Sequence, residues 1–380
     1  MKKFLFILII GVCYFNQFSW AQQQSFDEKI TDIMKQYQAI GLSVAVIKNN
    51  TMLFSQSYGL KNVEQDQILH RDDIFRIASI SKSFSATAIM QLIEQKKCHL
   101  DDDFSDLIGF KIRNPNFPDK KITLKMILSH TSSINDKNGY FDLDVINPTH
   151  SDQYKNSYSN YEPGTKYAYC NLNFNMIGAV IERLSGQRFD LYIKEHILDP
   201  LQLYAGYCVD SLDKQKFVTL YEYDNNKQEF NPQPNAYLSR SLEIKNYTIA
   251  HSTPVFSPTG GMKISAVDLA KYMGMHMNYG KGFNGLQIIK KSSSKLMQIP
   301  ITSDEGYGLA LMKTDKLVPH KTLIGHTGSA YGLYSAMFFD SKEKFGIVVI
   351  TNGCHVPEYT EFNPFLKDCI QHIYQTMIQN

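Results

Sequence analysis

A serine and a lysine three residues apart, Ser79 and Lys82, are the side chains whose types and spacing best fit chemistry. Mostly apolar residues 74–78 precede them, and residues 83–97, which contain neither Gly nor Pro, favour a helix. Because residues three apart share a helix face, the hydroxyl and the amine would lie side by side near the positive end of the helix dipole. A buried lysine with a lowered pKa can remove the hydroxyl proton. The pair therefore predicts a nucleophilic serine with a lysine base.

The spacing alone is weak support, because Ser-x-x-Lys also occurs at Ser211, Ser292 and Ser341. Those three serines lie in charged or Lys- and Ser-rich stretches, where a polar surface turn explains the pattern. Ser79 differs because an apolar stretch precedes it and a long helical pattern follows. This setting favours Ser79.

A tyrosine is the candidate proton donor for the leaving group, which acyl transfer also requires. Tyr169 and Asn171 follow a turn at residues 162–166 and open a predicted helix. The Tyr-x-Asn pattern recurs in the chain, and Tyr158 is the strongest rival. We favour Tyr169 because a turn-to-helix junction holds a side chain more rigidly than the Tyr- and Ser-rich loop around Tyr158.

A histidine followed by small residues ends one apolar stretch near the C-terminus: His326, Thr327, Gly328 and Ser329. A glycine there lets a substrate backbone approach the edge of a sheet. A lone histidine is usually structural, but the ten other histidines lack a comparable setting. We therefore expect His326 to face a bound acyl donor.

Residues 1–21 have the pattern of a secretory signal peptide. Two lysines precede an apolar run, and Ser19 and Ala21 give a small-x-small ending. The apolar run is short for a bilayer span. We therefore expect cleavage, export to the periplasm or the medium, and no stable membrane span in the mature chain.

The composition is that of an ordinary globular protein, with 380 residues, 43% hydrophobic and 20% charged. The formal net charge of +2 falls to zero without the two signal-peptide lysines, which argues against a nucleic-acid partner. The five cysteines beyond residue 21 show no metal spacing and no disulfide framework, so their pairing stays open. With no H-E-x-x-H motif, G-x-S-x-G elbow, P-loop or dinucleotide fingerprint, we expect no metal and no cofactor. The expected partner is a small-molecule or peptide substrate; the oligomeric state stays open.

Strand patterns occupy both terminal parts of the chain, and helical patterns with long polar loops lie between them. A capping box at Ser25 predicts a first helix from about residue 26 to 37. Residues 207–256 show no clear pattern. Strands are expected at residues 42–47, 52–58, 307–312, 322–325, 334–339 and 345–351, and helices at 124–128, 171–184, from 265 onward, and at 362–378.

These patterns predict an α+β fold in which strands from both termini form one antiparallel sheet flanked by helices, with a mostly helical insertion. We place an α/β sandwich domain at residues 22–82 and 300–380. The inserted helical domain would occupy residues 83–299.

Taken in order, the three motifs resemble the active-site motifs of the class C β-lactamase and DD-peptidase superfamily of penicillin-binding-protein-like serine hydrolases. Residues 128–132, 258–262 and 307–309 strengthen the resemblance, which covers nearly the whole chain after the signal peptide. It implies a β-lactamase/transpeptidase-like fold with the site at the junction of the sandwich and the helical domain. The motifs are Ser79-x-x-Lys82, Tyr169-x-Asn171 and His326-Thr327-Gly328.

The resemblance also implies a role for each matching residue. Ser79 would be the acylated nucleophile and Lys82 its base. Tyr169 would relay the proton to the leaving group, and Asn171 would hold the substrate amide. The strand side of the site would be His326, Thr327 and Gly328, and the oxyanion hole would be the backbone N–H groups of Ser79 and Ser329.

One departure bears on the substrate: the third motif is H-T-G, where β-lactamases carry K-T-G. Efficient β-lactam hydrolysis is therefore not the leading expectation. We expect an exported serine hydrolase that forms an acyl-enzyme at Ser79 and cleaves a small amide or ester, with D-amino-acid peptides as DD-peptidase-like candidates. The alternatives are a carboxylesterase of the same fold and a true class C β-lactamase. A binding protein on an inactive hydrolase scaffold is least favoured, because no member of the constellation is missing.

Overall fold

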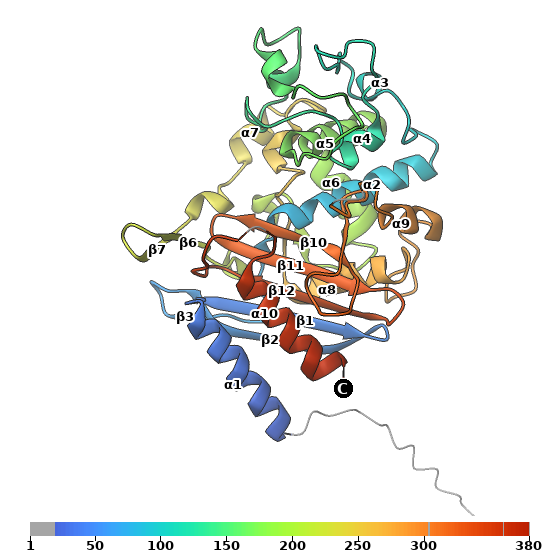
Figure 1. Cartoon of the computed structure of the whole chain (residues 1–380). Helices are drawn as coiled ribbons and strands as arrows, with labels where there is room; N and C mark the ends of the chain where they lie inside the picture. Colours follow the sequence, from blue (N-terminus) through green and yellow to red (C-terminus); the bar gives the residue numbers. More distant parts are fainter. Residues whose placement is uncertain (1–19, 303–304, 360, 380) are drawn as a thin grey trace, which may run out of the picture.

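The computed structural model describes residues 20–302, 305–359 and 361–379 (Figure 1). The expected signal peptide, residues 1–21, lies outside the described residues except for its last two positions, which begin helix α1 (Trp20–Gln36). In the part of the chain that the structure describes, no helix is both long and apolar enough to cross a membrane.

One antiparallel sheet joins the two ends of the chain, so that blue and red strands lie side by side in Figure 1. Its strand order is β3-β2-β1-β12-β11-β10-β9, and the central pairing of β1 with β12 places Leu42 opposite Thr351. This confirms the predicted α+β fold with a sheet built from both termini. The strands are β1 (Gly41–Lys48), β2 (Thr51–Asn62), β3 (Gln67–Ile68), β9 (Met312–Thr314), β10 (Leu323–Ala330), β11 (Leu333–Asp340) and β12 (Phe345–Thr351).

β1 and β2 form a hairpin with a two-residue turn. Asn49 and Asn50 both have positive φ, 52° and 65°. A two-residue turn of this kind matches the twist of the flanking strands, and asparagine tolerates the left-handed region better than most residues. The turn sets Lys48 opposite Thr51 and so fixes the register of the pair.

Helices cover both faces of the sheet. Val44 and Val46 of β1 belong to one buried apolar cluster together with residues of α1 and α10 (Pro364–Ile373). Ala45 and Ile47 alternate with them and join the second cluster, which includes residues of α8 (Ala266–Met277). Ser265 caps α8 by accepting from the Asp268 N–H, at the start of the helix expected from residue 265 onward.

The first helix starts earlier than expected. The prediction placed its start near residue 26 with Ser25 as the cap, whereas α1 begins at Trp20. The side chain of Gln23 donates to Asp27 at 3.0 Å and that of Gln24 to Glu28 at 3.0 Å, both four residues on. Such pairs stabilise a helix, so the glutamine-rich stretch extends α1 and Ser25 lies inside it.

Helices and long loops make up most of the remaining part of the chain. The long helices α2 (Ser81–Glu94) and α5 (Asn171–Ser185) pack against each other, and Gly186, with φ 75°, ends α5. The five described cysteines are buried and unpaired. The other elements are α3 (Phe104–Ile108), α4 (Leu124–Leu128), α6 (Phe189–Ile193), α7 (Ser241–Lys245) and α9 (Lys291–Met297), with short strands β4 (Phe75–Arg76), β5 (Ala205–Gly206), β6 (Tyr221–Asp224), β7 (Glu229–Pro232) and β8 (Lys263–Ile264).

The strand expected at residues 307–312 is not a strand. The chain turns there, because the Gly308 N–H donates to the Leu311 carbonyl at 2.7 Å and Ala310 has φ 60°. β9 begins only at Met312. The apolar residues of this stretch are buried in the core without a strand's regular pairing.

The proposed division into a sandwich domain, residues 22–82 and 300–380, and an inserted domain, residues 83–299, stays a prediction.

Candidate active site

Ser79 lies in a single 3-10 turn, η1 (Ala78–Ile80), directly before α2. The preceding Ala78 has φ 49°, a left-handed conformation that is unfavourable for a residue with a side chain. The Ser81 hydroxyl stabilises it by donating to the Ala78 carbonyl at 2.6 Å and accepting from the Met262 N–H at 3.0 Å. The surrounding structure therefore holds the Ser79 turn in one conformation.

Gly328 of β10 lets the sheet contact this turn. A Cβ at this position would lie 2.2 Å from the Ile77 carbonyl oxygen and 2.5 Å from the Ser335 hydroxyl. Ser335 itself donates to the Ile77 carbonyl at 3.1 Å. Any larger residue at position 328 would push the strand away from the turn that carries Ser79.

The outer edge of β10 is open beside the turn. β9 pairs only with Leu323–Gly325, so among the described residues no strand lies next to residues 326–330 on that side. Ser329 is exposed there and Thr327 is partly exposed. An open edge offers backbone N–H and C=O groups to an extended ligand.

Lys82 is fully buried beside Ser79. Its Nζ lies 3.1 Å from Ser79 Oγ, 3.0 Å from Asn171 Oδ1 and 3.0 Å from the Thr259 carbonyl oxygen. Burial lowers the pKa of Lys82 to about 7, although the charge of Asp136 opposes this shift. The Asn171 and Thr259 oxygens can only accept hydrogen bonds. A neutral Lys82 amine therefore donates one N–H group to each of them and directs its lone pair at the Ser79 hydroxyl.

Asp136 fixes Asn171 and the N-terminus of α5. Its carboxylate accepts from the backbone N–H groups of Asn171 and Leu172, both at 2.9 Å, and from Asn171 Nδ2 at 3.0 Å. Because Nδ2 faces Asp136, Oδ1 faces Lys82 and also accepts from the Thr259 hydroxyl at 3.0 Å. The carboxylate thus caps a helix and orients a side chain of the site at once.

Tyr169 lies over the amine of Lys82, with Nζ 4.6 Å from the ring centroid. Although 41% of the residue is exposed, desolvation of the phenol raises its pKa, and a hydrogen bond with Ser79 only partly opposes the rise. The hydroxyl therefore stays protonated near neutral pH and can act as a proton donor. Tyr158, the rival in the sequence, is buried elsewhere, and its hydroxyl has no partner in the described structure.

This difference between the tyrosines gives a test. Tyr169→Phe is expected to lower kcat by about a hundredfold or more, because a positioned acid or base typically contributes that much. Tyr158→Phe removes a hydroxyl that has no partner, so kcat should stay within about threefold and stability should not fall. Steady-state kinetics on both variants decide it, and the reverse ranking would mean that Tyr158 is the relay.

His326 is buried and neutral. Its Nδ1 lies 2.5 Å from the Thr327 carbonyl, which only accepts, so Nδ1 carries the proton, and Nε2 accepts from the Tyr307 hydroxyl at 3.0 Å. Burial, together with the charge of Lys82, lowers the pKa of His326 to about 4. The strand side of the site therefore presents no positive charge from this histidine at neutral pH.

A second buried histidine, His130, packs against Tyr169 with 4.4 Å between ring centroids. Its Nδ1 accepts from the Cys170 N–H at 3.2 Å, so the proton is on Nε2, which has no partner among the described residues. Burial holds the pKa of His130 well below its usual range, and the charge of Lys82 adds to this. A neutral imidazole thus supports the ring of Tyr169.

The structure brings Ser79, Lys82, Tyr169 and Asn171 together and places β10 beside them. The roles assigned to these residues stay predictions. The sequence did not point to Asp136, which lies in a polar loop with no motif of its own. His130, Thr259 and Tyr307 lie in stretches that strengthened the resemblance, but no role was assigned to them. Among the described residues, the group that could hold a metal ion lies elsewhere, at Asp144, His150 and His251.

Asp136 supports a prediction about pH. Its charge raises the pKa of Lys82, so Asp136→Asn should lower that pKa further. The acidic limb of the kcat/KM profile should then move to lower pH, and loss of the helix cap should cost about 1–2 kcal/mol of stability. The profile of kcat/KM against pH measures the shift of the limb, and thermal melts measure the loss of stability. The control is Asp142→Asn, which changes an exposed carboxylate of the same loop; an unmoved limb in Asp136→Asn would contradict the assignment.

The comparisons with known proteins agree with this fold. The Beta-lactamase family model matches residues 26–369, so the chain belongs to this family of serine hydrolases. Protein flp of Staphylococcus aureus strain MRSA252 is 24% identical over 356 residues, covering 89% of this chain. The chain spans only 65% of the length of that relative.

Solved structures share the fold. The octameric penicillin-binding protein homologue from Pyrococcus abyssi has a TM-score of 0.74 and 24% identity, over 94% of this chain and 77% of its own. EstCE1, a hydrolase with promiscuous acyltransferase activity, has a TM-score of 0.73 and 19% identity, and the match covers 93% of this chain and 99% of EstCE1. D-amino acid amidase from Ochrobactrum anthropi SV3 has a TM-score of 0.72 and 16% identity, and the match covers 94% of this chain and 99% of the amidase. At these identities the likeness shows the fold alone.

Proposed function

We propose that the protein hydrolyses a small amide or ester through an acyl-enzyme formed at Ser79, with D-amino-acid peptides as the favoured substrates. The observation that carries the proposal is the buried Lys82 amine, 3.1 Å from Ser79 Oγ, with a pKa lowered to about 7. Near neutral pH a large fraction of this amine is neutral and able to accept the hydroxyl proton.

In the proposed reaction, Lys82 takes the Ser79 proton while Oγ forms a bond to the substrate carbonyl carbon. The resulting oxyanion lies between the backbone N–H groups of Ser79 and Ser329, which supply donors of the kind worth about a hundredfold or more in rate. Tyr169 donates a proton to the leaving group as its bond to carbon breaks, and the proton that Lys82 took from Ser79 passes to Tyr169, so both groups return to their starting states. Water then releases the acyl group from Ser79. Asn171 and β10 residues Thr327 and Gly328 would hold the acyl donor.

Two observations favour an amide or peptide substrate over a β-lactam. Neutral His326 offers no positive charge to the carboxylate of a β-lactam, unlike the lysine of K-T-G. Two of the structural neighbours are a penicillin-binding protein homologue and a D-amino acid amidase. A carboxylesterase of the same fold is the second candidate, supported by the likeness to EstCE1. A true class C β-lactamase ranks behind both, and a non-catalytic binding protein ranks last.

The test is to incubate the purified protein with a penicillin, measure its intact mass and map any adduct by digestion while the loss of drug is followed. A stable adduct on the peptide that contains Ser79 supports the nucleophile and a penicillin-recognising peptidase. Rapid loss of drug without an adduct would establish a β-lactamase and contradict the reasoning from His326. If neither occurs, hydrolysis of D-amino-acid amides is compared with hydrolysis of simple esters, and activity on esters alone selects the esterase.

We also propose that the protein is exported, on the basis of the signal-peptide pattern in residues 1–21. Secreted protein should begin near Gln22. N-terminal sequencing checks this, and retention of Met1 in the exported protein would contradict it.

A further inference from the structure

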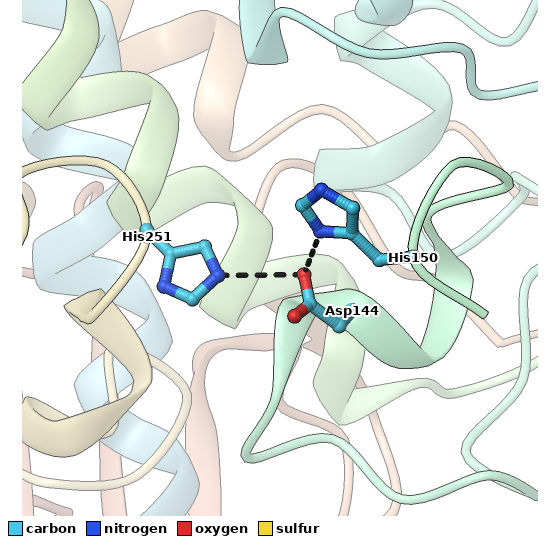
Figure 2. Close-up of side chains that lie close together, drawn as sticks. All are labelled: Asp144, His150 and His251. Carbon is cyan, nitrogen blue, oxygen red and sulfur yellow. Dashed lines mark hydrogen bonds and ion pairs between the residues drawn. The ribbon is translucent and has the colours of Figure 1, made fainter.

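Three side chains outside the active site converge from two loops. Figure 2 shows His150 and His251 directed at the same carboxylate oxygen of Asp144. His150 Nδ1 lies 2.6 Å from Asp144 Oδ1, and His251 Nε2 lies 3.3 Å from it. All three potential ligand atoms lie within 4.8 Å of one another. Asp144 and His251 are 107 positions apart in sequence, so the fold creates this cluster.

We propose that Asp144, His150 and His251 bind one divalent transition-metal ion, with Zn²⁺ as the best match. Two imidazole nitrogens and one carboxylate oxygen form a ligand set that suits Zn²⁺ and poorly suits Mg²⁺ or Ca²⁺, which take oxygen ligands. Three protein ligands leave a fourth tetrahedral position for water.

Two of the three distances between the ligand atoms lie close to those that such an ion requires, and the third, between the two imidazole nitrogens, is at most 4.8 Å. Zinc bonds of about 2.0–2.1 Å in a tetrahedron hold ligand atoms roughly 3.3–3.4 Å apart. The contact of Asp144 with His251 already has this spacing, at 3.3 Å. The contact with His150 must open by less than about 1 Å, and the His150 side chain is half exposed.

The cluster is also accessible to a cation. An aspartate such as Asp144 is ordinarily ionised near neutral pH. Both imidazoles are half exposed, so an ion can reach the three ligand atoms from solvent.

The backbone on each side of the cluster is already ordered, which limits the entropy lost on binding. Asn147 holds the loop between Asp144 and His150 by accepting from the Thr149 N–H at 3.0 Å and hydroxyl at 2.8 Å. Next to His251, the Ala250 N–H donates to the buried Glu182 at 2.6 Å. The Thr253 hydroxyl donates to the same carboxylate at 2.7 Å.

The ion would join two loops that both continue into the active site. The loop of Asp144 and His150 follows Asp136, which orients Asn171. The segment of His251 leads to Thr259, whose carbonyl accepts from Lys82. The metal would therefore stabilise the walls of the site without contacting the reacting atoms. The inference does not depend on the role of Ser79.

The test uses untagged, chelator-treated protein titrated with Zn²⁺ alone in a calorimeter. One equivalent should bind, and His251→Ala, His150→Ala and Asp144→Asn should each weaken binding at least tenfold. The matched control is His99→Ala, because His99 is an exposed histidine 3.7 Å from Asp102 with no third group. This control should bind Zn²⁺ as the wild type does.

Thermal melts give a second readout. Zn²⁺ at about a hundredfold excess over its Kd should raise the melting temperature of the wild type by about 3–5 °C, and Mg²⁺ should not. The His251→Ala protein should melt like the metal-free wild type and show no Zn²⁺ response. Absence of saturable Zn²⁺ binding, or equal affinities of the wild type and His251→Ala, would overturn the proposal.

Discussion

Ser79→Ala is expected to lower kcat/KM by about 10⁴–10⁶-fold on whichever amide or ester proves to be the substrate, because loss of the nucleophile leaves only substrate binding and the oxyanion donors. Fold stability should change little. The hydroxyl of Ser79 contacts Lys82 and Tyr169, whereas the turn is held by Ser81 and by the contact of Gly328 with Ile77. Steady-state kinetics and a thermal melt measure the two quantities.

The matched control is Ser292→Ala, which removes an exposed serine from another Ser-x-x-Lys sequence, in α9. Its activity and melting temperature should equal those of the wild type. A Ser79→Ala protein that kept more than a few per cent of activity would contradict the acyl-enzyme at this residue. The penicillin adduct should also be absent from the Ser79→Ala protein and present in Ser292→Ala.

Much of the fold could be predicted because its signals are local. The buried apolar runs in β1 and β12 are typical of strands covered on both faces, and Gly186 marks a helix end that needs a left-handed residue. The errors arose where contacts between distant parts of the chain determine the local structure. At residues 307–311 the apolar side chains are buried in the core, but the backbone does not pair as a strand. Ser25 had the pattern of a cap, but side-chain pairs from Gln23 and Gln24 extend the helix past it.

The candidate site divides in the same way. Ser79 and Lys82 are three residues apart, so helical geometry alone brings them together. Asp136 could not be found, because its importance depends on the loop folding back onto the N-terminus of α5, 35 residues away in sequence. The cluster of Asp144, His150 and His251 could not be predicted for the same reason, because sequence motifs are recognised by short spacings and the fold brings these residues together.

Lys82→Met is expected to lower kcat/KM by about 10²–10⁴-fold, the usual contribution of a positioned base. It should also remove the acidic limb of the pH profile of kcat/KM. In the wild type, kcat/KM should rise as pH increases through about 7, because the amine accepts a proton only after it has lost its own. The unfolded chain holds this proton up to about pH 10.5. Between these values the unfolded state binds more protons, so the contribution of Lys82 to stability rises with pH, and Lys82→Met should lose that rise.

Lys263→Met provides the matched control, because Lys263 is another buried lysine whose pKa is held well below its usual range by burial. Its Nζ donates to the Tyr207 carbonyl and has no contact with Ser79. This variant should keep the acidic limb near pH 7 and most of the turnover. If Lys82→Met retained the limb, or if Lys263→Met lost it, the base would have to be sought elsewhere. His326 titrates at about 4 and could not replace Lys82 as the group responsible for a limb near pH 7.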